Sequence, residues 1–296
     1  MELIFLGTSA MVPTETRNHT AMLLRFEGEG ILFDCGEGTQ RQFKQAKVSI
    51  TTITKILISH WHGDHVFGLP GVIQSLGMSQ YQGHIEIYGP KGTKLHMRQM
   101  FQAFGIQPTI PITIHEVKNG VIFENDTFLI QAEELEHNIP CLGYAFIEKD
   151  VRKINLQAAK KHGIPEGPLM GKLQQNKSIH HAGKVITPGE VTYLRPGKKI
   201  AVILDTVPCS GALKLAQDAD VLVCEATYTS ALEEKGEDRG HMTARQAAQL
   251  AQHAHAKKLI ITHFSARYTS FDQLEQDARE LFPEAQCAYD FLKVKL

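Results

Sequence analysis

The sequence predicts an α/β fold in which short buried strands alternate with helices through both halves of the chain. Three observations favour this fold class. Apolar runs of three to five residues alternate with segments that repeat apolar residues at helical spacing. Several of these runs end on a histidine, an aspartate or a glutamate. The 296 residues are 43% hydrophobic and 21% charged, which is enough apolar material for a sizeable core.

The first half begins with a strand and a hairpin. We expect strands at residues 3–6, 22–26, 31–33, 56–59 and 85–88, and a helix at residues 95–104. Gly28-Glu29-Gly30 forms the hairpin turn, and Asp34-Cys35-Gly36-Glu37-Gly38 forms a second tight turn. A capping box of Thr39 and Gln42 then opens a helix.

The second half repeats the alternation. We expect strands at residues 200–204, 221–223 and 259–262, and a helix at residues 212–217. Thr243 with Gln246 and Ser270 with Gln273 form two further capping boxes, each followed by apolar residues at helical spacing. Asp205, Glu225 and His263 stand at the carboxyl ends of these three strands, in this order.

The segment Ser59-His60-Trp61-His62-Gly63-Asp64-His65 is the densest group of metal-binding side chains. It follows a strand, and its glycine indicates a loop. Imidazole nitrogens and carboxylate oxygens are zinc ligands, and alternation along the loop can direct His60 and His62 to one metal ion and Asp64 and His65 to another. The alternative is a polar surface loop, but such loops rarely concentrate metal ligands in this way.

Three more residues complete a predicted ligand set. His137, Asp205 and His263 each have a structural alternative when taken alone, such as a helix cap for Asp205. Four apolar strands end at His60, Asp205, Glu225 and His263, and a sheet whose strand ends share one edge would gather these four residues into a single cleft. The set predicts two neighbouring sites that share Asp205, formed by His60, His62 and His137 and by Asp64, His65 and His263. Such a dinuclear centre activates water for hydrolysis, with Asp64 orienting the water and accepting its proton.

Residues 150–196 interrupt the compact pattern. A short helix at residues 156–162 is followed by a Gly/Pro-rich stretch, and basic side chains surround both. Length and composition indicate an insertion in a domain that otherwise spans residues 1–296. The segment is either a disordered linker between two halves or a flexible arm that grips a polyanion.

Charge and cysteine content narrow the function classes. A net charge of −1 excludes a uniformly basic nucleic-acid binder but not a local basic patch. Five scattered cysteines form no C-x-x-C pair, which favours a reducing compartment, and we expect a cytoplasmic protein. The first residues resemble a strand rather than a signal peptide, and no run approaches the length of a membrane span.

His60, His62, Asp64 and His65 match the H-x-H-x-D-H pattern and resemble the signature of the metallo-β-lactamase superfamily. The resemblance implies a four-layer αβ/βα sandwich with a dinuclear metal site. It implies two Zn²⁺ ions per subunit, and Mn²⁺ or Co²⁺ accept similar ligands.

Narrower motifs resemble the ribonuclease Z family, whose members process the 3′ ends of tRNA. They lie at residues 5–10, 13–18, 33–40, 164–169 and 263–268. The resemblance implies a short-form, homodimeric endoribonuclease that cuts precursor tRNA after the discriminator nucleotide. It also implies that the inserted arm, with Gly167, Pro168 and Lys172, holds the tRNA body.

The same resemblance implies roles for further residues. Glu225, in a Cys224-Glu225-Ala226-Thr227 version of the H-E-A-T motif, orients His241, and His241 protonates the leaving 3′ oxygen. Ser265, Arg267, Arg17 and Asn18 bind substrate, Arg267 through a charge-assisted fork to phosphate. The structural alternatives are a solvent-facing His241 at a helix start and local loop bonding by Ser265 and Arg267.

Three residues depart from the family pattern, and several functions remain open. Cys224 replaces a histidine, Leu204 replaces a glycine, and Glu15 occupies a usually basic position in the loop associated with sensing the 3′ CCA sequence. The nearest alternative function is a general phosphodiesterase or a 3′ exoribonuclease. A thioester or β-lactam hydrolase and a non-catalytic RNA- or protein-binding module are more distant alternatives.

Overall fold

The computed structural model describes residues 1–296, which divide into two compact units. Unit 1 comprises Met1–Glu124, Ile130–Phe146 and Lys199–Leu296, and unit 2 comprises Asn125–Leu129 and Ile147–Lys198. None of the helices combines the length and the apolar character that a membrane span requires.

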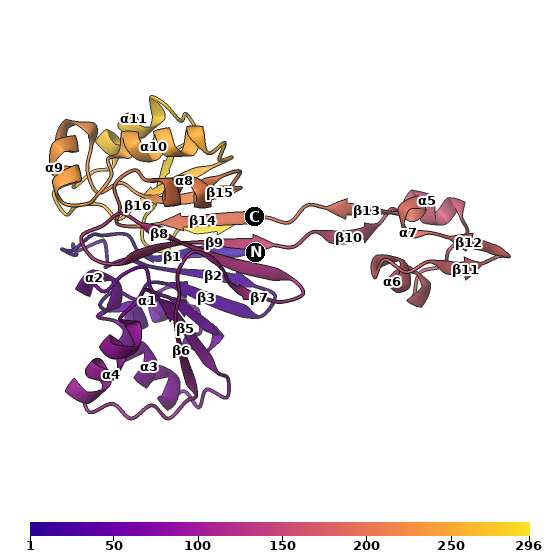
Figure 1. The fold of residues 1–296 in the computed structure, drawn as a ribbon, viewed down its shortest axis with the longest axis horizontal. Helices are drawn as coiled ribbons and strands as arrows, with labels where there is room; N and C mark the ends of the chain where they lie inside the picture. Colours follow the sequence, from indigo (N-terminus) through magenta and orange to yellow (C-terminus); the bar gives the residue numbers. More distant parts are fainter. The chain divides into compact units, whose positions relative to one another are not determined.

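The first sheet has seven strands in the order β18-β1-β2-β3-β4-β5-β6. Its strands are β1 (Glu2–Gly7), β2 (Ala21–Phe26), β3 (Glu29–Phe33), β4 (Lys55–Leu57), β5 (Ile85–Gly89), β6 (Ile112–Glu116) and β18 (Lys293–Lys295). Strands β18, β1, β2 and β3 pair antiparallel, whereas β3 to β6 pair in parallel. The two ends of the chain lie side by side, because Leu3 of β1 is paired with Val294 of β18 (Figure 1).

The second sheet also has seven strands, in the order β17-β16-β15-β14-β9-β8-β7. Its strands are β7 (Gly120–Glu124), β8 (Phe128–Leu135), β9 (Cys141–Glu148), β14 (Lys199–Ile203), β15 (Val221–Glu225), β16 (Leu259–Thr262) and β17 (Gln286–Cys287). Strands β14 to β17 pair in parallel. The carboxyl ends of β14, β15 and β16 therefore lie at one edge of this sheet.

Helices cover the outer faces of both sheets (Figure 1). The first sheet carries α1 (Thr39–Gln45), α3 (Leu69–Met78) and α4 (Thr93–Ala103), and the second carries α8 (Ser210–Ala216), α10 (Ala244–His253) and α11 (Asp272–Arg279). Shorter turns are η1 (Ile50–Thr52), α2 (Gly63–Val66), η2 (Ser230–Leu232) and α9 (Glu233–Asp238). Two mixed sheets between two helical layers confirm the predicted four-layer αβ/βα sandwich.

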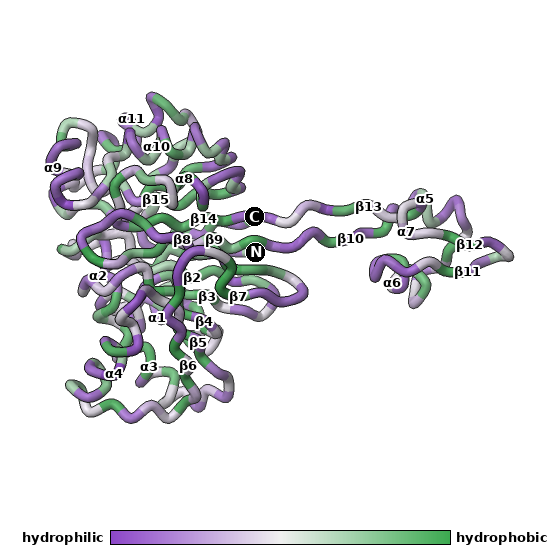
Figure 2. The backbone as a smooth tube through the Cα atoms, viewed as in Figure 1, coloured by the Kyte–Doolittle hydropathy of each residue, from purple (hydrophilic) through white to green (hydrophobic).

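Both faces of the central strands are buried. In β1, Ile4 and Leu6 pack in one apolar cluster with Phe43 of α1 and Leu76 of α3. Leu3 and Phe5, which point to the opposite face, are also buried. Figure 2 accordingly shows the strands of the two sheets mainly in green. Strands buried on two faces explain why apolar runs, rather than alternation, mark them in the sequence.

Unit 2 has an apolar core of its own. It contains β10 (Val151–Ile154), α5 (Leu156–Lys161), α6 (Pro168–Gln174), β11 (Ile179–His181), β12 (Lys184–Ile186), α7 (Pro188–Val191) and β13 (Thr192–Arg195). Strands β10 and β13 form one antiparallel pair, and β11 and β12 form another. The core is formed by Ala159, Ile164, Leu173, Ile179, Ile186 and Val191. The expected short helix is α5, and the RNA-holding role of this segment stays a prediction.

Two of the three predicted capping boxes are wrong. Helix α1 begins after Gly38, and the Thr39 hydroxyl donates to the carbonyl of Gly36 while the Gln42 amide donates to the carbonyl of Leu6. Helix α11 begins after Phe271, and Ser270 accepts only a bond from the Asp272 amide. The box of Thr243 and Gln246 is confirmed at the start of α10.

Candidate metal centre and catalytic site

The candidate ligands come from both sheets. Asp205 and His263 follow β14 and β16, and Glu225 ends β15. His60 follows β4 of the first sheet, so the expectation that one sheet edge supplies all four residues is wrong. The histidine segment is also not a loop throughout, because Asp64 and His65 lie in the single helical turn α2.

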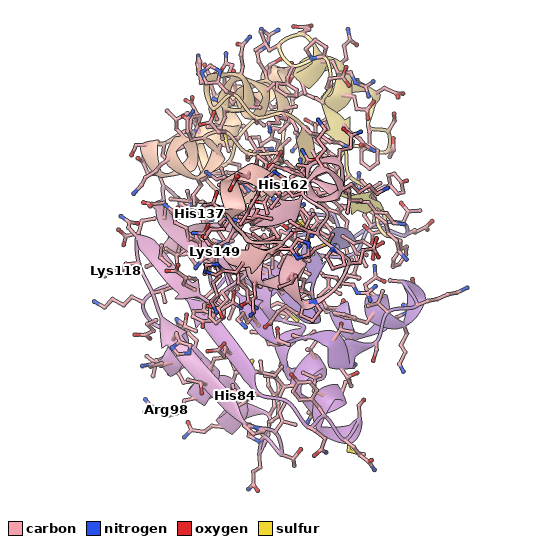
Figure 3. The ribbon with its side chains drawn as sticks, turned by 90° about the vertical axis from the view of Figure 1, so that its right-hand side faces the viewer. His84, Arg98, Lys118, His137, Lys149 and His162 are labelled. Carbon is pink, nitrogen blue, oxygen red and sulfur yellow. The ribbon has the colours of Figure 1, made fainter.

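Seven side chains converge in two groups. One group consists of His60, His62, His137 and Asp205, and the other consists of Asp64, His65 and His263. Within each group the candidate ligand atoms lie within 4.8 Å of one another. The Asp205 carboxylate lies between the groups, 3.6 Å from His60 Nε2 and 3.2 Å from His263 Nε2. His137 (labelled in Figure 3) follows β8, and its Nε2 lies 3.2 Å from His62 Nδ1. The structure thus brings together every residue of the predicted ligand set.

The hydrogen bonds of the outer ring nitrogens fit a metal centre. His65 Nδ1 donates to a carboxylate oxygen of Asp34 at 2.6 Å, and His137 Nδ1 donates to the carbonyl of Gly240 at 2.9 Å. With Nδ1 bonded on the outer side, each of these two rings directs its Nε2 atom toward the centre. His65 Nε2 faces His263 Nε2 at 3.2 Å, and the buried Oδ1 atoms of Asp64 and Asp205 accept no hydrogen bond. Converging ring nitrogens and buried carboxylate oxygens match the ligands of a divalent cation.

The two carboxylates at the centre stay ionised despite their burial. Burial alone would raise the pKa of Asp64, but hydrogen bonds from His263 and His65 lower it well below its usual value. Burial also opposes ionisation of Asp205, and the neighbouring charges of His263 and His65 hold its pKa well below the usual range. The centre therefore keeps negative charge available to cations.

Asp34 orients His65, although its sequence context predicts only a tight turn. Its Oδ2 accepts bonds from His65 Nδ1 and from the Ser59 hydroxyl, each at 2.6 Å, and its Oδ1 accepts the Ser59 amide at 2.7 Å. The side chain is fully buried directly after β3. The signal available in the sequence was an aspartate directly after an apolar strand.

We expect Asp34→Asn to weaken metal binding by about 10- to 100-fold, because the amide places a donor where His65 needs an acceptor. Metal content after competition with a graded chelator would measure this. Asp277→Asn is a matched control, since buried Asp277 also accepts a serine amide and hydroxyl, those of Ser230. Equal metal retention by the two variants would contradict the role of Asp34.

Glu225 and His241 form a pair beside the centre. Glu225 Oε1 accepts His241 Nδ1 at 3.1 Å and the Thr206 amide at 2.7 Å, and Oε2 accepts the Thr227 hydroxyl at 2.7 Å. Burial alone would lower the pKa of His241, but the Glu225 and Asp205 carboxylates raise it to about 9. With Nδ1 engaged, Nε2 is the His241 atom left to face a substrate.

A pocket of about 410 Å³ opens onto this centre. It is lined by Asp64, His62, His137, Asp205, His241 and His263, and by Ala10, Met11, Val12, Asn138, Thr227, Tyr228, Lys235, Arg239, Ser265, Ala266 and Arg267. Two predicted substrate-binding residues, Ser265 and Arg267, are therefore at the site. Arg267 Nε donates to the Ser265 hydroxyl at 3.2 Å, which leaves its terminal nitrogens for a ligand.

Arg17 and Asn18 do not line the pocket. The Arg17 guanidinium is buried, lies over the Phe271 ring and donates to the carbonyl of Ser265. The Asn18 side chain donates to the carbonyl of Glu37. Both residues hold the loop before β2 in place, and direct contact with RNA stays a prediction. Gly167, Pro168 and Lys172 lie in unit 2, at the start and within α6.

Asp290 anchors the loop before β2, and its raised pKa should make the stability of the protein depend on pH. Its carboxylate accepts the Thr8 hydroxyl and the Asn18 amide, each at 2.8 Å, and burial raises its pKa to about 6 although these bonds act in the opposite direction. Because the folded pKa lies above the unfolded value, the stability that this group contributes is present at about pH 4 and is lost as pH rises through about 6.

We expect the free energy of unfolding of wild type, relative to Asp290→Asn, to fall by about 2 kcal/mol between pH 4 and 7. Urea unfolding of both proteins across that range would measure the difference, and comparison with the variant cancels effects of the histidines. A pH-independent difference would contradict the raised pKa.

Comparisons with known proteins identify the family. A family model described as "Anti-Pycsar protein Apyc1" matches residues 1–127, and one described as "Beta-lactamase superfamily domain" matches residues 157–264. Ribonuclease Z of Methanothermobacter thermautotrophicus is 39% identical over 298 residues, which cover 100% of this chain and 97% of the relative. The chain belongs to the ribonuclease Z family.

Further relatives of the ribonuclease Z family agree in sequence and structure. Ribonuclease BN of Escherichia coli is 44% identical over 302 residues, covering 98% of each chain. The crystal structure of the short form of human tRNase Z has a TM-score of 0.74 and 30% identity, and the match covers 100% of this chain and 99% of the human one. A metallo-β-lactamase-fold protein from Bacillus subtilis, with a TM-score of 0.71 and 16% identity, shares the fold alone.

Proposed function

We propose that the chain is a zinc-dependent endoribonuclease that removes the 3′ trailer of precursor tRNA. The cut falls after the discriminator nucleotide and leaves a 3′ hydroxyl on the tRNA and a 5′ phosphate on the trailer. Membership of the ribonuclease Z family supports the substrate class. The observation that carries the chemistry is the Glu225–His241 pair beside the convergent ligands, because this geometry joins a proton donor to a metal centre.

In the proposed mechanism, two Zn²⁺ ions would be held by His60, His62 and His137, by Asp64, His65 and His263, and by the shared Asp205. When bound, the cations lower the pKa of water and neutralise charge on the phosphate oxygens. Asp64 lines the pocket, and its Oδ1 atom accepts no hydrogen bond within the protein, so the carboxylate can take up the proton of the attacking water. His241 Nε2 delivers a proton to the leaving 3′ oxygen, and Glu225 stabilises the charged imidazole.

We propose a homodimer working in the cytoplasm, in which unit 2 of one subunit holds the tRNA body for the partner. Five free cysteines support a reducing compartment. Lys172 in α6 and Lys160 and Lys161 in α5 supply positive charge for a phosphate backbone.

A general phosphodiesterase or 3′ exoribonuclease on the same centre is the second candidate. This candidate is supported by the general nature of the chemistry. The metal ligands and the Glu225–His241 pair would act on any phosphodiester that reaches them. The cationic side chains at the pocket favour a polynucleotide over a small diester.

The test is to incubate zinc-loaded protein with a precursor tRNA that carries a short trailer without CCA, and to map the product ends. We expect one cut after the discriminator nucleotide, absent in Asp64→Ala and retained in the surface control Asp218→Ala. An intact precursor together with hydrolysis of a small phosphodiester would favour the second candidate, and stepwise shortening of the trailer would indicate an exonuclease.

Glu15 leads to a prediction about CCA-bearing ends. It is exposed in the turn that the Thr14 amide closes with the carbonyl of Arg17, at a position usually basic in the family. A carboxylate there repels phosphate, so we expect nearly equal cleavage of precursors with and without CCA. Glu15→Lys should increase discrimination by roughly three- to tenfold, the range for one exposed charge. Strict rejection of CCA by wild type would contradict this expectation.

A further inference from the structure

One wall of the pocket carries three basic side chains that the mechanism leaves unused or only partly used. Lys235 lies in α9, Arg239 follows that helix, and Arg267 lies beyond β16. The acidic residues of α9 do not line the pocket, although Figure 2 shows this helix largely in purple. The wall is therefore cationic within a mainly hydrophilic segment.

Tyr228 lies at the centre of this wall. Its ring is 6% exposed, with the Arg267 guanidinium carbon 5.2 Å and the Lys235 ammonium nitrogen 6.0 Å from the ring centroid. Both distances are within the range of a cation–π contact. The Tyr228 carbonyl accepts the Ala244 amide at 2.8 Å, which fixes the residue against the start of α10. The ring, rather than a hydrogen bond of its hydroxyl, is what contacts the two cations.

These cations lack the carboxylate partners that basic residues have elsewhere in the chain. Arg195 pairs with Glu148, Lys214 with Glu133 and Arg279 with Glu275. Lys235, Arg239 and Arg267 form no ion pair within the protein, and Arg267 uses only Nε, toward Ser265. Unpaired cations that converge on a pocket are suited to an anionic ligand.

The segment that carries Arg239 is fixed to the metal centre. The Asn138 amide donates to the carbonyl of Arg239 at 3.2 Å, and His137 Nδ1 bonds to the carbonyl of Gly240 at 2.9 Å. A Cβ at Gly240 would lie 2.6 Å from His137 Nδ1, and φ is +72° there, so only glycine fits this approach. The end of α9 therefore has a set position relative to His137 and the candidate metal centre.

We propose that Tyr228 is a positioning residue that holds Lys235 and Arg267 as a clamp for the backbone phosphates next to the scissile one, with Arg239 as a third contact. This inference rests on the proposed function and names how the site selects a polynucleotide. A small diester offers only the reacting phosphate, whereas RNA offers neighbouring phosphates to these cations. Lys235 is then an RNA-binding residue and not a catalytic one.

The experiment compares Tyr228→Leu, Tyr228→Phe and Lys235→Met, with Lys91→Met as a control at an exposed lysine outside the pocket. The readouts are kcat and KM for precursor tRNA, the rate on bis(p-nitrophenyl) phosphate, and the Kd of a short single-stranded RNA measured by anisotropy. The RNA Kd tests the clamp even if no RNA is cut, so failure of the proposed function is a separate result.

We expect Tyr228→Leu and Lys235→Met to raise KM and the RNA Kd by roughly tenfold, within the range for cation–π and charge-assisted contacts. The ratio of RNA cleavage to diester hydrolysis should fall by a similar factor. Tyr228→Phe should retain wild-type values because it keeps the ring. The salt dependence of RNA binding in Lys235→Met should become less steep by about 0.7 to 0.9, the slope of one phosphate contact.

Three results would overturn the proposal. An unchanged Kd and salt slope in Lys235→Met would remove the phosphate contact. Parallel losses on RNA and on the small diester in Tyr228→Leu would indicate a merely structural role. A Tyr228→Phe variant as weak as Tyr228→Leu would assign the effect to the hydroxyl.

Discussion

His241→Ala is expected to lower kcat for precursor tRNA by roughly 10²- to 10⁴-fold while the metal content stays unchanged. The size follows from the loss of a positioned general acid for a poor alkoxide leaving group. His241 Nδ1 bonds to Glu225 at 3.1 Å but lies 3.9 Å from Asp205, so its main partner is a carboxylate outside the ligand set.

The leaving group provides the sharper test of that role. Nitrophenolate leaves without a proton, so bis(p-nitrophenyl) phosphate hydrolysis should lose far less than RNA cleavage in His241→Ala. His253→Ala, at an exposed histidine at the end of α10, is the control. Loss of metal from His241→Ala would instead make it a ligand, which is possible because candidate ligand atoms of Asp205, His241 and His263 also lie within 4.8 Å of one another. Equal losses on both substrates would remove the proton-donor role.

Asp205→Ala should remove metal from both sites and lower RNA cleavage by at least about 10²-fold. Its carboxylate lies within 3.6 Å of His60 Nε2 and within 3.4 Å of His65 Nε2, so one substitution affects both groups. Without this buried negative charge, two cations would face five imidazoles and Asp64 alone.

Metal analysis of the purified variant would measure the loss per chain. Asp218→Ala is a matched control, because Asp218 has a positive φ, as Asp205 does, but does not belong to the candidate metal centre. It separates the loss of the carboxylate from the cost of changing the backbone at such a position. Two bound metal ions in Asp205→Ala would contradict the shared ligand.

The sequence predicted which residues converge at the candidate metal centre better than it predicted the sheets from which they come. Apolar runs before His60, Asp205 and His263 mark buried strands, and strand ends are where such residues meet. A buried strand has the same apolar sequence pattern in either sheet. The sequence therefore did not indicate that β4 belongs to the first sheet, whereas β14 and β16 belong to the second. Pairing partners far apart in the chain decide that assignment.

Polar side chains at turns were harder to interpret, because several backbone groups compete for them. Thr39 and Gln42 have the spacing of a capping box, but Gln42 reaches Leu6 and Asp290, which are distant in sequence. Asp34 has the context of a turn residue, yet its buried carboxylate supports His65. Lys235 and Arg267 approach the Tyr228 ring from separate elements, so no short sequence pattern could have predicted these contacts.

The direction of bond cleavage tests the central claim most directly. Precursor tRNA would be cut in ¹⁸O-enriched water and both products analysed by mass spectrometry. Hydrolysis with His241 protonating the 3′ oxygen predicts a trailer whose 5′ phosphate carries one ¹⁸O atom, and a tRNA with an unlabelled 3′ hydroxyl. A 2′,3′-cyclic phosphate, or label in a 3′ phosphate on the tRNA, would contradict the assigned roles of Asp64 and His241.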